Sequence, residues 1–207
     1  MKGLFITFEG PDGSGKTTIA TRVVEELKKR GFEVVHTREP GGIDIAEQIR
    51  NVILDPKNTR MDGKTEALLY AASRRQHLVE RVYPALNNGQ IVICERFLDS
   101  SLAYQGYGRQ LGFDEILSIN AFAIDGTYPD KTIYLAIDEE KGLERIKDRS
   151  FKDRLDKESI DFHHRVSEGY QEVLRRFSDR ICVIDASNDI ETVTSDCLNV
   201  IMGLING

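Results

Sequence analysis

Short apolar runs alternate with helix-periodic segments along almost the whole chain. Five runs are short and apolar on both faces, as is typical of buried strands: residues 4–8, 32–37, 90–95, 132–137 and 180–185. Strands that alternate with helices and are buried on both faces belong to a parallel sheet covered on both sides. We therefore predict an α/β fold, a doubly wound sheet of five parallel strands flanked by helices. In such sheets ligands bind at the carboxyl ends of the strands.

The longest helical pattern runs from about Asp62 to Asn87. Its apolar positions predict a face packed on the core: Leu68, Ala71, Leu78, Val82 and Leu86. The polar positions share another face: Glu66, Tyr70, Ser73, Arg74, His77 and Arg81. The ring of Tyr70 beside the guanidinium of Arg74 suits a flat heterocycle. For His77 and Arg81 we expect a solvated surface instead.

Composition and charge narrow the class of protein. The 207 residues are 40% hydrophobic and 30% charged, which is ordinary for one globular domain spanning residues 1–207. The net charge of −6 argues against a broad nucleic-acid surface. Cys94, Cys182 and Cys197 are far apart and indicate reduced thiols. Because no signal-peptide pattern and no apolar stretch of membrane-spanning length occurs, we expect a cytoplasmic protein that does not enter the membrane.

A phosphate-binding loop lies between the first predicted strand and a helical pattern. Residues 10–17, Gly-Pro-Asp-Gly-Ser-Gly-Lys-Thr, fit the pattern G-x-x-x-x-G-K-[ST]. Its glycines let backbone N–H groups surround a polyphosphate, Lys16 supplies a charge, and the Thr17 hydroxyl can bind Mg²⁺. We expect ATP to contact Gly10, Asp12, Gly13, Ser14, Gly15, Lys16, Thr17 and Thr18. The loop alone does not distinguish kinases from motor ATPases or nucleotide switches.

Charged residues follow two other predicted strands at the same edge of the sheet. Arg38 and Glu39 precede a Pro-Gly-Gly sequence, which favours a substrate-binding loop over a plain turn. Glu95 and Arg96 end the third strand, where a carboxylate opposite the phosphate loop can serve Mg²⁺ or an acceptor hydroxyl. The polar and aromatic segment 99–108 that follows is suited to lining a pocket.

One segment breaks the alternation of strands and helices. Residues 145–157 contain few apolar side chains and the basic residues Arg145, Lys147, Arg149, Lys152 and Arg154. We predict that this segment is a mobile basic lid, in which Arg154 is tied to Asp156. Closure of such a lid would exclude water, which otherwise competes as phosphoryl acceptor.

Five segments together resemble the motifs of the bacterial thymidylate kinases, in that family's order: residues 8–17, 37–42, 71–75, 99–106 and 154–156. The resemblance covers essentially the full length, and its Arg-Glu-Pro-Gly-Gly and Ala-Tyr-Gln-Gly segments are specific. It implies a P-loop nucleoside monophosphate kinase fold. It also implies transfer of the γ-phosphoryl group of ATP to thymidine 5′-monophosphate (dTMP), with Mg²⁺, by a homodimer.

The resemblance implies a set of side chains that bind the acceptor. They are Asp12, Arg38, Glu39, Arg50, Tyr70, Ser73, Arg74, Arg96, Ser101, Tyr104 and Gln105. Thymine would stack on Tyr70 and meet Arg74 at its O4, with Ser101 and Gln105 nearby on the base. Tyr104 would fill the space that a 2′-hydroxyl needs.

The resemblance also implies roles at the sugar and the phosphates. Asp12 would meet the 3′-hydroxyl, and the acceptor phosphate would be held by Arg38, Arg50 and Arg96. Glu39 would support the metal and phosphate site.

The resemblance further implies the catalytic groups Lys16, Glu95, Arg96 and Arg149, with Thr17 and Glu95 at the metal. One branch of the family carries an arginine where this chain has Gly13. We therefore expect the basic lid to supply the missing charge, with Arg149 as the catalytic cation. Glu95 departs from the aspartate that is usual in the family and is one methylene longer.

Two alternative functions remain open from the sequence. A related nucleoside monophosphate kinase with another acceptor would share the loop but lack the pairs Tyr70 with Arg74 and Tyr104 with Gln105. A non-enzymatic nucleotide switch would have a guanine-specifying loop or a partner helix in place of an acceptor pocket.

Overall fold

The computed structural model describes residues 3–138, 141–142, 144 and 153–207. Its sheet has five strands, β1 (Leu4–Glu9), β2 (Val34–Arg38), β3 (Ile91–Glu95), β4 (Lys131–Ala136) and β5 (Ile181–Asp185), in the order β2-β3-β1-β4-β5. Every neighbouring pair is parallel; β1 and β3, for example, pair Leu4 with Ile91 and Phe8 with Glu95. The predicted strands and the doubly wound parallel sheet are confirmed, with strand ends that differ by one or two residues.

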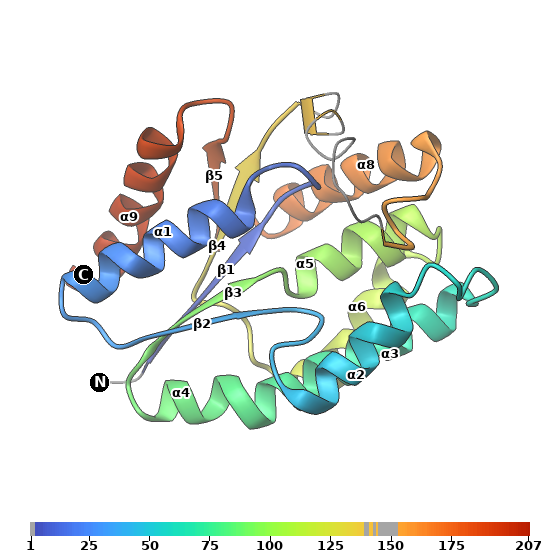
Figure 1. Cartoon of the computed structure of the whole chain (residues 1–207), viewed down its shortest axis with the longest axis horizontal. Helices are drawn as coiled ribbons and strands as arrows, with labels where there is room; N and C mark the ends of the chain where they lie inside the picture. The colour runs from blue at the N-terminus through green and yellow to red at the C-terminus, as the bar shows by residue number, and fades with distance from the viewer. Residues whose placement is uncertain (1–2, 139–140, 143, 145–152) are drawn as a thin grey trace.

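Successive side chains of the central strands enter two separate cores, because strand residues alternate between the faces of a sheet. Ile6 and Phe8 of β1 belong to the core under α1 (Lys16–Lys29) and α9 (Ile190–Asn206). Phe5 of the same strand belongs to the core on the opposite face. That face is covered by helices including α6 (Phe113–Ile124) and α8 (Ile160–Arg176), as Figure 1 shows.

The predicted long helix consists of three consecutive helical pieces. They are α3 (Gly63–His77), a π-helical turn η1 (Leu78–Val82) and α4 (Tyr83–Asn87). The Asp62 side chain caps its first turn by accepting a hydrogen bond from the Thr65 amide at 3.0 Å. Four of its five predicted core residues are buried, whereas Leu68 is 56% exposed, so that prediction is wrong.

The polar face of α3 differs from the prediction at one position. Solvent exposure was expected at both His77 and Arg81. Arg81 is exposed, but His77 has no exposed surface. The reason is that α3 packs between α2 (Asp44–Leu54) and α6, with the loop after β2 against its polar face. This arrangement directs the polar side chains of α3 inward, toward the carboxyl ends of the strands.

A second irregular helix follows β3. It begins as α5 (Leu98–Ser101) and continues as a π-helical segment, η2 (Leu102–Gly108), that packs along α8. The three cysteines are free thiols, of which Cys94 and Cys197 are buried. Among the described residues, no helix combines the length and the apolar character needed to cross a lipid bilayer.

Candidate active site

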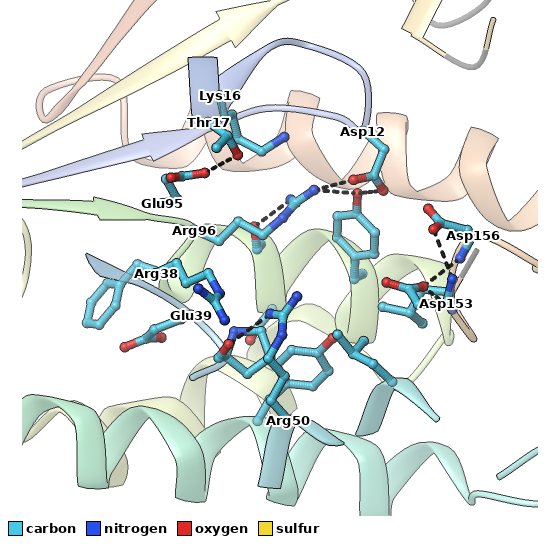
Figure 2. Close-up of a pocket in the computed structure, with 18 of the residues that line it drawn as sticks. Asp12, Lys16, Thr17, Arg38, Glu39, Arg50, Glu95, Arg96, Asp153 and Asp156 are labelled. Carbon is cyan, nitrogen blue, oxygen red and sulfur yellow. Dashed lines mark hydrogen bonds and ion pairs between the residues drawn. The ribbon is translucent and has the colours of Figure 1, made fainter. Parts of the chain in front are cut away.

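A cavity of about 390 Å³ opens at the carboxyl ends of β1, β2 and β3, bounded by the phosphate loop, α3 and η2 (Figure 2). It brings together most of the residues expected from the sequence: Asp12, Gly13, Gly15, Lys16, Thr17, Thr18, Arg38, Glu39, Arg50, Tyr70, Arg74, Glu95, Arg96, Ser101, Tyr104 and Gln105. Arg149 lies outside the described residues.

Three of the expected residues do not line this cavity. The carbonyl oxygen of Gly10 and the hydroxyl of Ser14 instead accept hydrogen bonds from the Lys16 ammonium, at 2.9 and 3.3 Å. Ser73 is fully buried, and its hydroxyl accepts a hydrogen bond from the amide of Gly41 at 3.3 Å. These residues therefore lie behind the cavity wall and hold cavity-lining segments in place.

The conformation of the phosphate loop depends on its glycines. Gly15, directly before α1, has a φ of +84°, and Gly13 has a φ of +80°. In this left-handed region a side chain is strained, whereas glycine is not. The loop thereby ends at the amino terminus of α1, where unpaired N–H groups and the helix dipole favour an anion.

Lys16 has an unusual charge state. Burial, and next the neighbouring Arg96, lower the pKa of its ammonium to about 7. An anion placed beside it would favour the charged form and oppose this shift. Lys16 is therefore poised to take up a proton when a phosphate group binds.

Thr17 and Glu95 place two oxygen ligands side by side. The Thr17 hydroxyl donates to Oε2 of Glu95 at 2.5 Å, and His36 Nε2 lies 2.9 Å from Oε1 (Figure 2 shows the first contact). Burial opposes ionisation of Glu95, but the hydrogen bonds from His36 and Thr17 outweigh it and lower its pKa below the ordinary value. An ionised carboxylate beside a hydroxyl at the phosphate loop fits a magnesium ion, which prefers oxygen ligands.

Arg96 is held in place from several directions. Its backbone has a φ of +64°, which is uncommon for a residue with a side chain, and its amide donates to the Phe8 carbonyl at 2.9 Å. Its guanidinium donates to Asp12 at 2.5 Å and lies over the ring of Tyr104, 5.1 Å from the centroid. The hydroxyl of Tyr104 in turn donates to Asp12 at 2.7 Å. A fixed cation thus lies between the phosphate loop and the rest of the cavity.

Two further arginines enter the cavity, from the end of β2 and from α2. Arg38 forms an ion pair with Glu47 at 2.8 Å, and its side chain is half exposed. Arg50 donates to the carbonyl of Pro40 at 2.8 Å. Burial, followed by repulsion from Arg38, lowers the pKa of Arg50. The neighbouring like charges favour a bound anion between them.

At the opposite end of the cavity, Arg74 is almost completely buried and bound by its neighbours. Its Nε donates to Oε2 of Glu39 at 2.7 Å, and its NH1 donates to the Ser101 hydroxyl at 3.1 Å and to Asn120. This orientation leaves NH2 as the guanidinium nitrogen without a hydrogen-bond partner in the part of the chain that the structure describes. A planar cation fixed in this way can read one edge of a heterocycle.

Glu39 lines the cavity, but its carboxylate is directed at Arg74 and His77. Its Oε1 lies 2.9 Å from Nδ1 of His77, whose Nε2 lies 2.7 Å from the Thr37 hydroxyl. Both carboxylate oxygens of Glu39 thus face Arg74 and His77. The role at the metal and phosphate site that the resemblance implied for Glu39 stays a prediction.

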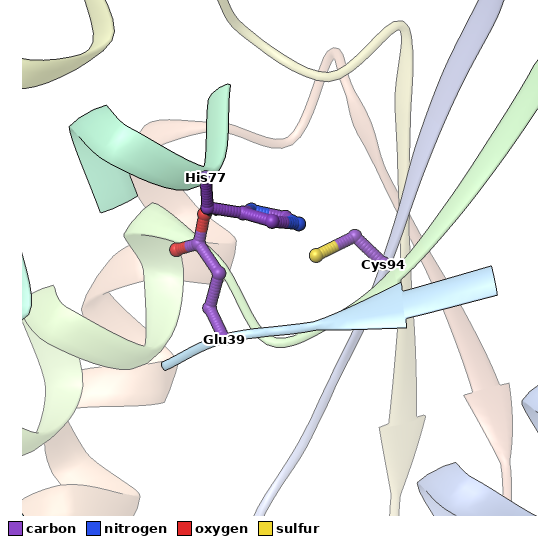
Figure 3. A group of neighbouring side chains, drawn as sticks. All are labelled: Glu39, His77 and Cys94. Carbon is purple, nitrogen blue, oxygen red and sulfur yellow. Dashed lines mark hydrogen bonds and ion pairs between the residues drawn. The ribbon is translucent and has the colours of Figure 1, made fainter. Parts of the chain in front are cut away.

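Glu39, His77 and Cys94 also form a buried group whose potential metal-binding atoms lie within 4.8 Å of one another (Figure 3). Both ring nitrogens of His77 already have hydrogen-bond partners, and the Cys94 thiol donates to the carbonyl of Arg96 at 3.2 Å. Burial raises the pKa of Cys94 well above its ordinary value, which disfavours the thiolate that binds metals. We therefore interpret the group as support for Arg74.

Sequence reasoning missed several side chains of the site. His36 and Asn120 orient Glu95 and Arg74 from strand β2 and helix α6. Asp153 and Asp156 line the cavity from the segment before α8. The one sequence signal is at Asn120, a polar residue in the otherwise apolar stretch of α6.

The predicted contact between Arg154 and Asp156 is wrong. Arg154 instead donates to Oε2 of Glu66 at 2.5 Å and to the carbonyl of Ile53 at 2.8 Å. Because Glu66 has no exposed surface, it offers Arg154 a charge partner shielded from water, whereas Asp156 lines the open cavity.

A phosphate loop at β1, five parallel strands in this order and a cavity that extends from the loop to Arg74 define a P-loop kinase of the nucleoside monophosphate type. The sequence model of the family described as Thymidylate kinase matches residues 8–197. The chain belongs to the thymidylate kinase family.

Individual relatives agree with this assignment. The chain is 62% identical to a thymidylate kinase of Bacillus velezensis, covering 97% of this chain and 96% of the relative. It is 57% identical to one from a Geobacillus species, covering 100% of both. Among solved structures, a thymidylate kinase from Ehrlichia chaffeensis matches with a TM-score of 0.78 and 34% identity, covering 98% of this chain and 99% of that one.

Proposed function

We propose that this protein transfers the γ-phosphoryl group of ATP to dTMP, giving thymidine diphosphate and ADP. The observation that carries the proposal is the single cavity that joins the phosphate loop to a base-sized pocket walled by Tyr70, Arg74 and Gln105. A nucleotide switch has no use for such a pocket. The full-length similarity to thymidylate kinases supports the same substrates.

Phosphoryl transfer asks the protein mainly for position and charge, because the acceptor phosphate is already an anionic nucleophile. ATP phosphates on the phosphate loop and a dTMP phosphate near Arg38 and Arg50 would meet at Arg96. Its guanidinium offsets the repulsion between donor and acceptor and the charge that develops in the transition state. Lys16 serves the donor phosphates.

Magnesium is part of the proposal. Thr17 and Glu95 would hold the ion, and His36 would keep the Glu95 carboxylate turned toward it. The bound ion would neutralise charge on the donor phosphates.

The sugar would lie against Tyr104. Its ring is 5% exposed, and its hydroxyl is tied to Asp12, so the ring cannot easily move aside for a 2′-hydroxyl. Asp12 would accept a hydrogen bond from the 3′-hydroxyl. The basic residues 145–157 would form the lid, and Arg149 would be its catalytic cation.

A homodimer in the cytoplasm completes the proposal. Apolar side chains remain exposed on three adjacent helices: Phe122 of α6 (91%), Leu68 of α3 (56%), and Ile45 and Val52 of α2 (49% and 48%). A second copy would cover them. Sedimentation velocity should give twice the chain mass, and replacing Phe122 and Leu68 with arginine should give the monomer.

The test of the activity is coupled ADP release with each nucleoside monophosphate in turn. dTMP should be the best acceptor, and dCMP should be rejected because its N4 amino group meets the donor Arg74. dUMP lacks only a methyl group, worth about 1–3 kcal/mol, and should be a poor but detectable acceptor. Equal rates across the acceptors would contradict the proposal.

A further inference from the structure

Glu66 is a buried carboxylate on α3 to which the reaction assigns no role. Its side chain has no exposed surface, and three side chains converge on it. Gln105 Nε2 donates to Oε1 at 2.8 Å, Arg109 Nε donates to Oε2 at 3.1 Å, and Arg154 NH2 donates to Oε2 at 2.5 Å. Of these partners, Gln105 also lines the cavity.

The two arginines keep Glu66 ionised. Burial alone would raise its pKa, but the hydrogen bonds from Arg109, Gln105 and Arg154 outweigh burial and lower the pKa below its ordinary value. An ionised carboxylate has no proton to donate and can only accept hydrogen bonds. The atom of Gln105 that faces Glu66 must therefore be the NH₂ group, and the amide cannot turn over without losing this bond.

This contact decides which atom Gln105 offers to a ligand. With Nε2 turned toward Glu66, Oε1 is the other end of the amide, and no described residue donates a hydrogen bond to it. Thymine and uracil carry an N3–H donor next to the O4 acceptor, whereas cytosine carries an N3 acceptor next to an N4 donor. An acceptor at Gln105 can receive the N3–H of thymine or uracil, while the donor at Arg74 binds their O4. In cytosine both groups would meet their own kind, an acceptor at N3 and a donor at N4, so cytosine is disfavoured.

We propose that Glu66 is a positioning residue for base specificity, which holds the amide of Gln105 in the one orientation that selects N3–H and O4 and rejects cytosine. This inference rests on the proposed function and adds the origin of its selectivity. The competing explanation is structural: Glu66 would only neutralise Arg109 and Arg154.

The decisive variant is Glu66→Gln, compared with Glu158→Gln. A glutamine at position 66 can donate as well as accept, so the Gln105 amide is free to turn. We expect the ratio of kcat/KM for dTMP to that for dCMP to fall by about tenfold, the value of one hydrogen bond. Glu158 pairs with the same Arg109 at 2.6 Å, whereas the amide of Gln105 donates to Glu66, so the Glu158 variant should keep the ratio. Equal losses for both acceptors in Glu66→Gln would overturn the proposal in favour of the structural explanation.

A second comparison tests whether Glu66 acts through Gln105. In a Gln105→Ala background there is no amide to orient, so adding Glu66→Gln should leave the acceptor ratio unchanged. A further fall of similar size in this background would overturn the proposal.

The test survives a folding defect. If thermal melting shows that Glu66→Gln is unfolded, the variant Glu66→Gln with Arg154→Met removes the cation that would lose its charge partner and is measured instead, with the same expected fall.

Failure of the two proposals is also distinguishable. An unmodified enzyme that used dCMP as well as dTMP would overturn both, whereas intact discrimination in Glu66→Gln would overturn only the role of Glu66.

Discussion

The triphosphate end of the cavity centres on one continuous stretch, residues 10–17, joined by Glu95 and Arg96, whereas the base end is assembled from side chains on α3, α5 and η2. At the first end, backbone N–H groups and the amino terminus of α1 are ready to meet an anion. At the second, Arg74 and Gln105 must be turned to the right angle by Glu39, Asn120 and Glu66. The anion-binding backbone of the loop lies within one stretch of sequence, whereas the side chains of the base end need a second row of residues behind them to orient them.

Charge is handled differently at the two ends as well. Lys16 is buried with its pKa lowered to about 7, because the nearby carboxylates Asp12, Glu9 and Glu95 only partly offset the effects of burial and of Arg96. Arg74 has a permanent ion-pair partner in Glu39 at 2.7 Å. The triphosphate end therefore gains most of its interaction energy when substrate binds, while the base end is preorganised. The predictions that follow test this contrast, from the largest expected effect to the smallest.

The largest effect is expected at Arg149. Gly13 stands where one branch of the family carries an arginine, and we propose that the lid supplies this missing charge to the transferring phosphoryl group. Arg149→Ala should lower kcat by about 10³- to 10⁵-fold with little change in the KM for dTMP, because the contact forms mainly in the transition state. Steady-state kinetics would show this. If Arg149→Ala and Lys152→Ala each kept kcat within about threefold, the lid would supply no catalytic cation.

Lys16→Ala should reduce phosphoryl transfer by about 10³-fold while the chain stays folded, since the ammonium stabilises charge that grows toward the transition state. The matched control is Lys29→Ala at the other end of α1. That lysine is exposed and pairs with Glu26, so its variant should turn over normally. Near-normal turnover in Lys16→Ala would contradict the role of the loop lysine.

Tyr104 should show a smaller effect, limited to the sugar. Tyr104→Ala should narrow the preference for deoxyribo- over ribonucleotide acceptors by about tenfold, because removing the ring makes room for a 2′-hydroxyl. Tyr104→Phe keeps the ring but loses the bond to Asp12 that fixes it, so it should lose only part of the preference. The measurement is kcat/KM for dTMP and for its ribonucleotide analogue. An unchanged preference in a folded Tyr104→Ala would place Tyr104 outside the sugar pocket.

The smallest expected effect is the uptake of a proton by Lys16 when a triphosphate binds. With a pKa of about 7, Lys16 is mostly neutral in the free enzyme at pH 8. A bound triphosphate raises that pKa, so binding should take up close to one proton at pH 8, and affinity should weaken as pH rises above 7. Titration calorimetry in buffers of different ionisation enthalpy measures this uptake. Lys16→Ala is the control, and an uptake equal in both proteins would assign the proton elsewhere.

The contrast between the two ends also explains how far the sequence could be interpreted. The strands, the phosphate loop and the charged strand ends depend on neighbours in the chain, and they were predicted correctly as elements. His77 was predicted to be solvated because a helical pattern shows which residues share a face, but not that α2, α6 and the loop after β2 cover this one. Its partner Glu39 is 38 residues away in the sequence.

The residues behind the base end were not predicted either, because their partners are also distant in the sequence. Asn120 reaches Arg74 across 46 residues, and Arg154 reaches Glu66 across 88. Such partners are set by how the helices pack on the sheet. A nearby charge of the right sign, as Asp156 is for Arg154, was therefore a misleading guide.

Gly13 and Gly142 lie so close together that neither position leaves room for a side chain. A Cβ atom on Gly13 would overlap the carbonyl oxygen of Gly142, and one on Gly142 would come within 2.7 Å of the Asp12 carbonyl oxygen. A single mutation that placed an arginine in this phosphate loop would therefore have to displace the segment before the lid as well. The close approach of the two glycines thus makes the loop and the segment before the lid sterically dependent on each other.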